Sequence, residues 1–382
     1  MNLEGMCDPA FEPVRRTLQE NFDTYGERGA AVCVYQDGRK VVDLWGGHRD
    51  AAATVLWDED TLCIVYSISK SICALAVHML VDRGVLDLEA PVADVWPEFG
   101  TLGKEHILLR HTVSHHDGMC FADHAQHGDV FRSEALLAAL ERQVPAWPPG
   151  TQGAYNSANI GYLLGEVVRR ATGRRIDRFI ADEICAPLGV EFVIGLHGEQ
   201  LARVAELTPN PDNAMFNDGN TPGSPLARAW QPMPEGYSVA HMNSRELRTG
   251  YVPSFGGHAT ARGVARVYAT LAEGGELDGV RLLSQQAIER MTTEQWDQID
   301  GTRGRPTRMG MGFFLNRPGS TPLGPNPRTF GHPGSGGALA FADPDARIAF
   351  CAQTNYQCEG SGVGRRTERL VDAVYGSLAA GW

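Results

Sequence analysis

The spacing of apolar residues predicts a helix and a β-hairpin near the start of the chain. Residues 8–24 repeat apolar side chains with the period of an amphipathic helix. Two short apolar runs follow, at 30–35 and 40–45, and Asp37-Gly38 lies between them. An Asp-Gly pair between two such runs is a strong signal for a tight turn. We therefore expect one helix followed by two antiparallel strands.

A second helix is predicted to begin at Ser67. Its apolar positions have helical spacing and fall at 72, 75, 76, 79 and 80. The pattern stops at Arg83-Gly84, and glycine is common just past the end of a helix. A long amphipathic helix is therefore expected, with Ser67 in its first turn and Lys70 one turn later.

The middle of the chain has a different character from either end. Helical patterns at 135–143 and 158–172 are separated by long connections rich in Pro, Gly and Asn, of which 207–236 is the longest. Loops of that length in a compact domain usually border a functional site. This segment predicts a helical, loop-rich unit with pocket-forming loops.

Beyond about residue 258 the pattern returns to a helix, two strands and a closing helix. The expected elements are a helix at 259–273, strands at 336–342 and 346–353, and a helix at 365–379. The simplest assembly is an α/β fold. In it, residues 1–92 and 258–382 form one discontinuous domain, and residues 93–257 form a helical domain inserted between its two parts.

Composition narrows the choice of partners and location. The 382 residues are 43% hydrophobic and 21% charged, as in a globular protein, and the net charge of -12 argues against nucleic acids and anionic membranes. No apolar run is long enough to span a bilayer, and the start of the chain lacks the pattern of a secretory signal. We therefore expect a cytoplasmic protein. Its eight cysteines contain no Cys-x-x-Cys pair, which favours reduced, buried thiols over disulfides or zinc ligands.

Ser67-x-x-Lys70 is the first pattern that carries chemistry. Residues three apart share a helix face, so the lysine amine can activate the serine hydroxyl without a histidine. That role needs a depressed lysine pKa, which burial and the positive end of the helix dipole both favour. Taken alone, the pattern fits equally well a helix N-cap followed by a solvated lysine.

Two further segments complete a candidate active site. Tyr155 lies on a loop before a helical pattern and is suited to relay a proton to a leaving group. Residues 331–337 are rich in glycine and precede a strand, where free backbone N–H groups could stabilise an oxyanion. Each segment alone also fits a structural role, as a capping loop with a packed aromatic ring and as a glycine-rich turn.

The order and spacing of the three segments resemble serine hydrolases related to class C β-lactamases, D-peptidases and penicillin-binding proteins, and above all family VIII carboxylesterases. Ser67-x-x-Lys70 is similar to the nucleophile motif of that superfamily, and Tyr155 to its second motif. His332-Pro333-Gly334 stands where the family has its Lys-Thr-Gly strand motif. The resemblance covers nearly the whole chain. It implies a β-lactamase-like fold, with an antiparallel sheet flanked by helices and an inserted helical domain.

The resemblance also implies roles for individual residues. Ser67 would attack the acyl carbon, Lys70 would activate it, and Tyr155 would share the base role and protonate the leaving group. The backbone N–H groups of Ser67 and Ser335 would form the oxyanion hole. Gly334 and His332 would belong to the same substrate-binding strand, with His332 hydrogen-bonded to substrate or to Tyr155. No metal or cofactor is implied.

Two departures from the family pattern favour esters over β-lactams. Position 157 is serine where the family usually has asparagine, and His332 replaces a lysine whose charge helps to hold the β-lactam carboxylate. A neutral ester needs neither group. The expected activity is therefore hydrolysis of small carboxylic esters through an acyl-Ser67 intermediate. We expect the 207–257 loops to form the wall of the acyl or alcohol pocket. The candidate wall residues are Phe216, Trp230, Tyr237 and Tyr251.

Other functions use the same residues or neighbouring ones. An acyltransferase, or a hydrolase of D-amino-acid peptides or β-lactams, would use the same serine, and pocket shape and water access decide between them. A non-catalytic ligand-sensing protein is disfavoured by the intact serine, lysine and tyrosine. A zinc site among six histidines between positions 106 and 127 is disfavoured because they form no recognisable ligand motif. The oligomeric state is left open, a homo-oligomer included.

Overall fold

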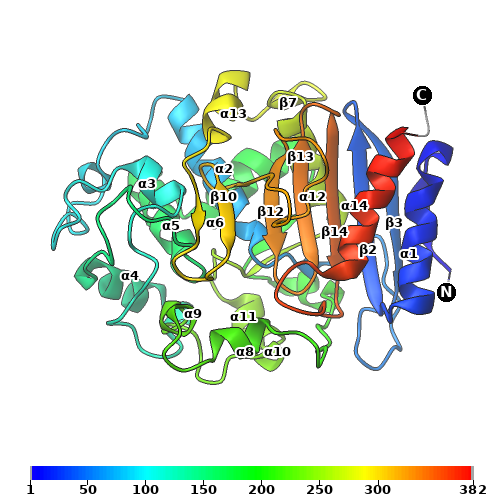
Figure 1. Cartoon of the computed structure of the whole chain (residues 1–382), viewed down its shortest axis with the longest axis horizontal. Helices are drawn as coiled ribbons and strands as arrows, with labels where there is room; N and C mark the ends of the chain where they lie inside the picture. Colours follow the sequence, from blue (N-terminus) through cyan, green and yellow to red (C-terminus); the bar gives the residue numbers. More distant parts are fainter. Residues whose placement is uncertain (1, 380–382) are drawn as a thin grey trace.

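A nine-stranded antiparallel sheet forms the centre of the molecule (Figure 1). The structure is a computed structural model and describes residues 2–379. In spatial order the strands are β1 (Glu4–Cys7), β3 (Arg39–Gly47), β2 (Gly29–Gln36), β14 (Ile348–Thr354), β13 (Ala338–Asp343), β12 (Phe330–Gly334), β11 (Phe314–Leu315), β10 (Pro306–Met309) and β9 (Trp296–Ile299). Because β2 and β3 from the start of the chain pair beside β14 and β13 from its end, the two ends share one sheet.

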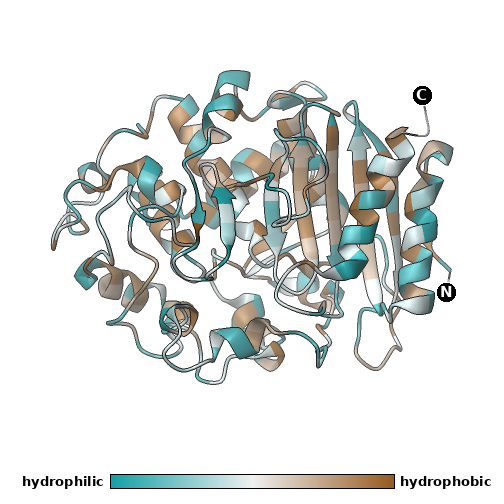
Figure 2. Cartoon of the chain, in the orientation of Figure 1, coloured by the Kyte–Doolittle hydropathy of each residue, from teal (hydrophilic) through white to brown (hydrophobic). Residues whose placement is uncertain are grey.

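Helices cover both faces of this sheet. On one face α1 (Glu12–Thr24) packs against α14 (Gly364–Ala379), and on the other α12 (Ala261–Ala272) contacts β2, β13 and β14. The central strands are buried on both faces, which explains their nearly continuous apolar sequences. Figure 2 shows hydrophilic residues on the outward sides of α1 and α14. The expected antiparallel sheet flanked by helices is confirmed.

Residues 93–257 contribute no strand to the large sheet. Their helices are α3 (Leu109–Val113), α4 (Ser133–Arg142), α5 (Ile160–Thr172), α6 (Ile176–Ile180), α7 (Ala186–Leu188), α8 (Met215–Gly219), α9 (Pro225–Ala229), α10 (Val239–Met242) and α11 (Arg245–Thr249). A small sheet joins this segment to the rest of the chain, because β5 (Phe192–Ile194) pairs with β6 (Gly257–Ala259), and β6 pairs with β4 (Cys63–Ile64). The remaining elements are α13 (Gln285–Met291), β7 (Glu276–Leu277) and β8 (Val280–Arg281).

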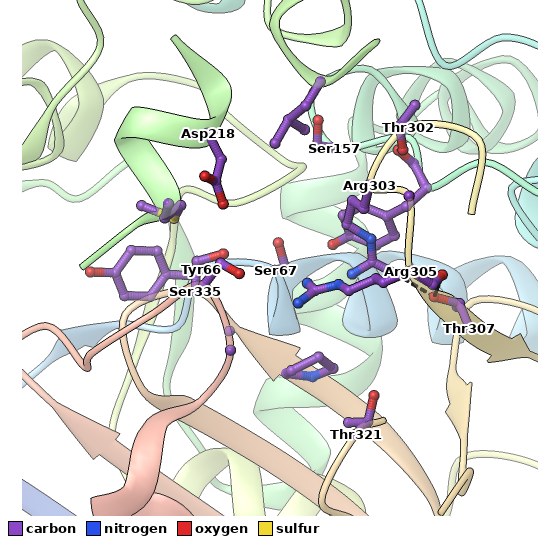
Figure 3. Close-up of a pocket in the computed structure, with 18 of the residues that line it drawn as sticks. Tyr66, Ser67, Ser157, Asp218, Thr302, Arg303, Arg305, Thr307, Thr321 and Ser335 are labelled. Carbon is purple, nitrogen blue, oxygen red and sulfur yellow. Dashed lines mark hydrogen bonds between the residues drawn. The ribbon is translucent and has the colours of Figure 1, made fainter. Parts of the chain in front are cut away.

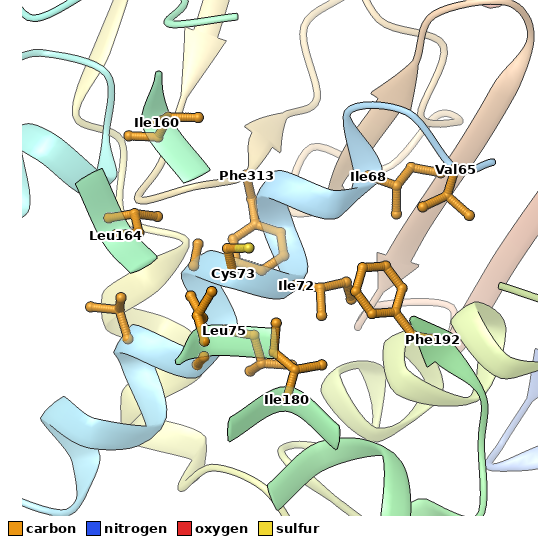
Figure 4. Packing of buried hydrophobic residues seen from close by; sticks show 14 of the residues in the cluster. Val65, Ile68, Ile72, Cys73, Leu75, Ile160, Leu164, Ile180, Phe192 and Phe313 are labelled. Carbon is orange, nitrogen blue, oxygen red and sulfur yellow. The ribbon is translucent and has the colours of Figure 1, made fainter. Parts of the chain in front are cut away.

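Helix α2 (Ile68–Asp82) lies between the large sheet and the helical segment. The expected helix is present, but its expected amphipathic character is wrong. Every residue from Ile68 to Leu80 is buried, so the helix is enclosed on all sides. Figure 4 shows its side chains packed against α5, α6 and β5, and the labelled contacts include Ile72, Cys73, Leu75, Ile160, Leu164, Ile180 and Phe192. Ser67 is therefore the N-cap residue of a helix that is enclosed by the rest of the protein.

The predicted hairpins are present, but several strands were missed. Asp37 and Gly38 both have positive φ, at 49° and 70°, as a tight turn between β2 and β3 requires. Sequence patterning did not reveal β1 or the four strands from β9 to β12, which are short and carry polar residues, proline or glycine. Seven of the eight cysteines are buried, as expected. None of the helices within residues 2–379 combines the length and hydrophobicity that crossing a membrane requires.

Candidate active site

Ser67 stands at the N-terminal end of α2, at the wall of a cavity of about 740 Å³. The preceding residue, Tyr66, is buried and has a left-handed backbone with φ of 48°, which is unusual for a non-glycine residue. This turn brings the chain from β4 into the helix and leaves Ser67 partly exposed while its neighbours are buried. The hydroxyl is therefore accessible from the cavity on an otherwise rigid segment.

Lys70 lies directly beneath this hydroxyl. Its Nζ is 3.0 Å from Ser67 Oγ and donates a hydrogen bond to the backbone carbonyl of Ser254, at 2.8 Å. The lysine is only 1% exposed and has no carboxylate partner among residues 2–379. Burial lowers its pKa well below the ordinary value, and the positive charge of Arg303 acts in the same direction. The arrangement favours a neutral amine beside the serine.

Tyr155 lines the same cavity, and Lys70 Nζ lies 5.1 Å from the centre of its ring. Its backbone is held on both sides: the N–H donates to Asp300 Oδ1 at 3.1 Å, and the carbonyl accepts from Thr302 Oγ1 at 2.9 Å. Burial raises the pKa of the phenol, while Arg303 and a hydrogen bond with Ser67 oppose that rise. The phenol therefore keeps its proton at neutral pH and can donate it.

An ion pair behind Tyr155 fixes this part of the site. Arg303 donates through Nε to Asp300 Oδ2 at 2.7 Å, and its guanidinium lies 4.3 Å from the centre of the Tyr155 ring. Burial alone would raise the pKa of Asp300, but Arg303 and hydrogen bonds from Thr302 hold it at about 2. The carboxylate is thus charged and fully engaged in holding the tyrosine loop.

The glycine-rich segment approaches Ser67 from the large sheet. Gly334 ends β12, and a Cβ on it would lie 2.7 Å from the Val65 carbonyl oxygen, so only glycine permits this close approach. Ser335 follows and lines the cavity with Ser67, as Figure 3 shows. Within residues 2–379 neither the Ser67 nor the Ser335 backbone N–H donates a hydrogen bond. Both amides are free to bind an oxygen atom in the cavity.

His332 lies behind the cavity wall. It is fully buried, its Nδ1 is 2.8 Å from the Pro333 carbonyl oxygen, and its ring centre lies 6.0 Å from that of Tyr155. Burial and nearby Lys70 lower its pKa well below the ordinary value, so the ring is neutral. Tyr155 was one of the two expected hydrogen-bond partners of His332, the other being substrate, and the structure shows no hydrogen bond between these two residues. Their rings are instead in packing contact.

His115, one of the histidines considered as a zinc ligand, instead packs against Tyr155. His115 stacks on Tyr155 with ring centres 5.0 Å apart, and its Nδ1 accepts a hydrogen bond from the Asn156 N–H. Burial and nearby Lys70 lower the pKa of His115 to about 3. Across residues 2–379, no three His, Cys, Asp or Glu side chains group as a metal site would require.

The cavity has an apolar part and a polar part. The 207–257 loops contribute Met215, Leu226, Trp230, Met233, Tyr237, Met242 and Phe255. Of the four aromatic residues expected to form the pocket wall, Trp230 and Tyr237 line the cavity. The other two do not: Phe216 packs against the rings of Trp230 and Tyr237, and Tyr251 packs against Tyr162. The polar part comes from residues 302–307 and from Ser320 and Thr321.

Sequence reasoning missed three polar residues of the site. Asp300, Arg303 and Arg305 belong to the turn between β9 and β10, and their Asp-, Gly- and Arg-rich sequence is indistinguishable from that of a surface turn. Ser157, two residues after Tyr155, lines the cavity, and its Oγ has no hydrogen-bond partner in the described structure. The sequence singles out this position, because the family usually has asparagine there.

Comparison with known proteins places this geometry in a family. The model of the family described as Beta-lactamase matches residues 14–374. Esterase/beta-lactamase LipL of Mycobacterium tuberculosis is 31% identical over 368 residues, which cover 92% of this chain and 82% of that protein. The structure of a family VIII carboxylesterase is 35% identical with a TM-score of 0.91, covering 99% of this chain and 100% of that one.

A penicillin-binding protein homologue from Caulobacter crescentus is similar to a comparable degree. It is 34% identical with a TM-score of 0.90, and the match covers 99% of this chain and all of that one. The similarity therefore extends over the whole fold and includes each segment that lines the cavity. The chain belongs to the beta-lactamase family of serine hydrolases, together with family VIII carboxylesterases.

Proposed function

We propose that this serine carboxylesterase cleaves small carboxylic esters through an acyl-enzyme on Ser67. The observation that carries the proposal is the 3.0 Å distance between Lys70 Nζ and Ser67 Oγ, with the lysine almost wholly buried. A serine hydroxyl is a weak nucleophile until a neighbouring base takes its proton. Burial supplies that base, because it leaves more of the amine neutral at pH values where an ordinary lysine is charged.

The first step forms a tetrahedral intermediate. Ser67 Oγ attacks the ester carbonyl carbon while its proton passes to Lys70 Nζ, and the carbonyl oxygen becomes an oxyanion. The free N–H groups of Ser67 and Ser335 can donate to that oxyanion. Fixed donors of this kind contribute strongly to acyl transfer, because each is worth roughly a hundred- to a thousandfold in turnover.

The second step releases the alcohol. The bond between the acyl carbon and the alcohol oxygen breaks, and that oxygen takes a proton from Tyr155, which recovers one from Lys70. Burial supports the donor role, since it keeps the phenol protonated at neutral pH. Water then attacks the acyl carbon of acyl-Ser67, and the same groups move its proton in reverse order. The products are the alcohol and the carboxylic acid, and Ser67 is restored.

The shape of the cavity supports a small, partly apolar substrate. Its volume of about 740 Å³ is in the range of small-molecule sites. Trp230, Tyr237 and Phe255 offer an apolar surface for an acyl chain close to Ser67. Such a surface stabilises a bound chain by roughly 25 cal/mol for each Å² of apolar area removed from water.

Labelling with a fluorophosphonate, followed by peptide mass mapping, tests the nucleophile. We expect the label on Ser67 and none after Ser67→Ala, together with loss of 4-nitrophenyl butyrate hydrolysis. Ser361→Ala is the matched control, because Ser361 lines the same cavity without a lysine partner and should leave labelling intact. Labelling that persists in Ser67→Ala would refute the proposal. Rapid quenching with the ester should show a butyryl adduct by intact mass.

A further inference from the structure

Arg305 is a cation of the cavity wall that has no ion-pair partner within residues 2–379. Its neighbours differ from it in this respect: Arg303 is paired with Asp300 at 2.7 Å, and Arg308 is paired with Glu294 at 2.7 Å. The Arg305 side chain is half-buried and lines the cavity beside Thr307. A half-buried arginine without a carboxylate partner is available to bind an anion.

The charges around Arg305 leave it cationic. Burial lowers its pKa to about 10 and Arg303 acts in the same direction, whereas Asp300, Tyr155 and Asp218 oppose the shift. Asp300 is already occupied by Arg303 and the tyrosine loop. Asp218 also lines the cavity but is exposed, and within residues 2–379 it forms no ion pair with Arg305. The guanidinium thus keeps its charge and its five N–H donors at neutral pH.

Arg305 lies near Tyr155, the proposed proton donor, in the cavity wall. In Figure 3 its guanidinium points toward Ser67, with Arg303 and Thr307 beside it. Arg305 and Tyr155 are close enough to shift each other's pKa, and Tyr155 is the proposed proton donor to the departing alcohol. The apolar surface suited to an acyl chain comes from a different segment, which includes Trp230 and Tyr237.

We propose that Arg305 binds a carboxylate on the alcohol part of the substrate, so that the preferred substrates are acyl esters of hydroxycarboxylic acids. The proposal rests on the proposed ester hydrolysis at Ser67 and names its substrate class. Arg305 determines specificity in this scheme and takes no part in bond making or breaking. The bond that breaks is still the one between the acyl carbon and the alcohol oxygen.

Two matched esters test the proposal: 4-(butanoyloxy)benzoate and its neutral methyl ester. Both form the same butanoyl-Ser67, so the two reactions share one deacylation step and differ only in binding and acylation. The quantity measured is the ratio of kcat/KM for the acid to that for the methyl ester. Comparing this ratio between variants cancels the intrinsic reactivity of the two phenols.

Arg305→Gln should lower the ratio about ten- to a hundredfold, the range expected for a lost charge-assisted hydrogen bond. Arg305→Lys should keep part of the preference, since it retains the charge and loses the two-pronged geometry. Arg308→Gln is the matched control on the same hairpin and should leave the ratio unchanged. An equal fall for both esters in Arg305→Gln would overturn the proposal, as would a wild-type ratio that does not decrease when salt is added.

Binding to Ser67→Ala separates this proposal from the proposed function. Calorimetry should show tighter binding of the acid than of the methyl ester to Ser67→Ala, and Ser67→Ala/Arg305→Gln should lose the difference. Equal binding of both esters to Ser67→Ala would overturn the role of Arg305 even if Ser67 is the nucleophile. Conversely, hydrolysis that survives Ser67→Ala would show that Ser67 is not the nucleophile. The difference in binding between the acid and the methyl ester would still test the role of Arg305.

Discussion

The side-chain nitrogen of Lys70 donates a hydrogen bond to the backbone carbonyl of Ser254 at 2.8 Å. The hydroxyl of Ser254 in turn accepts from the Gly161 N–H at 2.9 Å and donates to the Ala158 carbonyl, so this residue joins α2 to the start of α5. A neutral amine has two N–H groups and one lone pair. With one N–H directed to Ser254, the lone pair can face Ser67 Oγ, 3.0 Å away.

The pH dependence of hydrolysis should reveal the neutral lysine. Lys70 accepts a proton only when neutral, so kcat/KM should rise with pH and level off below 10.5, because burial lowers its pKa. Lys70→Met should lower kcat/KM roughly a hundred- to ten-thousandfold. Lys40→Met is the control, since Lys40 pairs with Asp43 away from the cavity and should leave the profile unchanged. A wild-type profile that still rises above pH 10.5 would contradict a depressed lysine pKa.

Removing one oxygen atom from Tyr155 should separate proton transfer from packing. Tyr155→Phe keeps the stacking on His115 and the contact with Arg303, so we expect an unchanged thermal unfolding midpoint. Loss of the proton donor should lower kcat by roughly a hundred- to ten-thousandfold. The loss should be smaller for esters of acidic phenols than for alkyl esters, because a good leaving group needs less protonation. Equal losses for both ester types would argue against proton donation.

The helix that follows Ser67 could be predicted from the sequence, because helix formation depends on the spacing of residues that are close together in the chain. Ser67 and Lys70 are one turn apart, and any helix there brings their side chains together. The relation of Tyr155 to this pair came only from the resemblance, since 85 residues separate it from Lys70 and no local rule brings the two together. The enclosure of α2 depends on α5, α6 and β5, which local patterning does not place around it.

Arg303 and Arg305 escaped prediction for a related reason. Their turn follows β9, a short strand of mixed polarity in which only Trp296 is buried, and the turn itself contains only Asp, Gly, Thr and Arg. Those residues are typical of surface turns. The strand β12 was hidden because it contains Pro333 and two glycines, which disfavour strands in general. Here Gly334 is needed for close approach to the chain before Ser67, and Gly331 for close packing against β13.

Asp300 should be important for both folding and catalysis. Asp300→Asn removes the charge that faces Arg303 and turns an N–H₂ group toward existing donors, in a side chain that is fully buried. We expect a loss of roughly 3 kcal/mol in the free energy of unfolding, measured in urea. Turnover should fall as well, because the Tyr155 loop loses its anchor. Asp297→Asn, in the exposed pair with Arg317 on the same hairpin, should cost at most about 0.5 kcal/mol.

A single methyl group at position 334 should disturb the oxyanion site. In Gly334→Ala the new Cβ would lie 2.7 Å from the Val65 carbonyl oxygen and 2.9 Å from the Ala338 Cβ, so β12 must move away from Ser67. We expect kcat to fall by about tenfold or more as the Ser335 N–H shifts. The control is Gly376→Ala in α14, where no atom lies near the new Cβ. Unchanged turnover in Gly334→Ala would show that Ser335 does not stabilise the oxyanion.

His258 should contribute to loss of stability in acid. It is buried on β6, and burial lowers its pKa to about 3, whereas an unfolded histidine has a pKa of about 6.5. Between these values the unfolded chain binds the proton and the folded chain does not. The free energy of unfolding therefore falls as pH decreases, by about 1.4 kcal/mol per pH unit from this group.

His258→Asn isolates this contribution, because its amide can keep the hydrogen bond that His258 Nδ1 makes with the Gly256 carbonyl at 3.0 Å. Urea unfolding at several pH values should show a smaller slope for the variant between pH 6.5 and 4.5, and parallel curves above pH 7.5. The comparison uses only the pH dependence, so a constant loss of stability from the substitution does not affect it. If the stability difference between the two proteins were constant across the whole range, His258 would not be held neutral in the folded state.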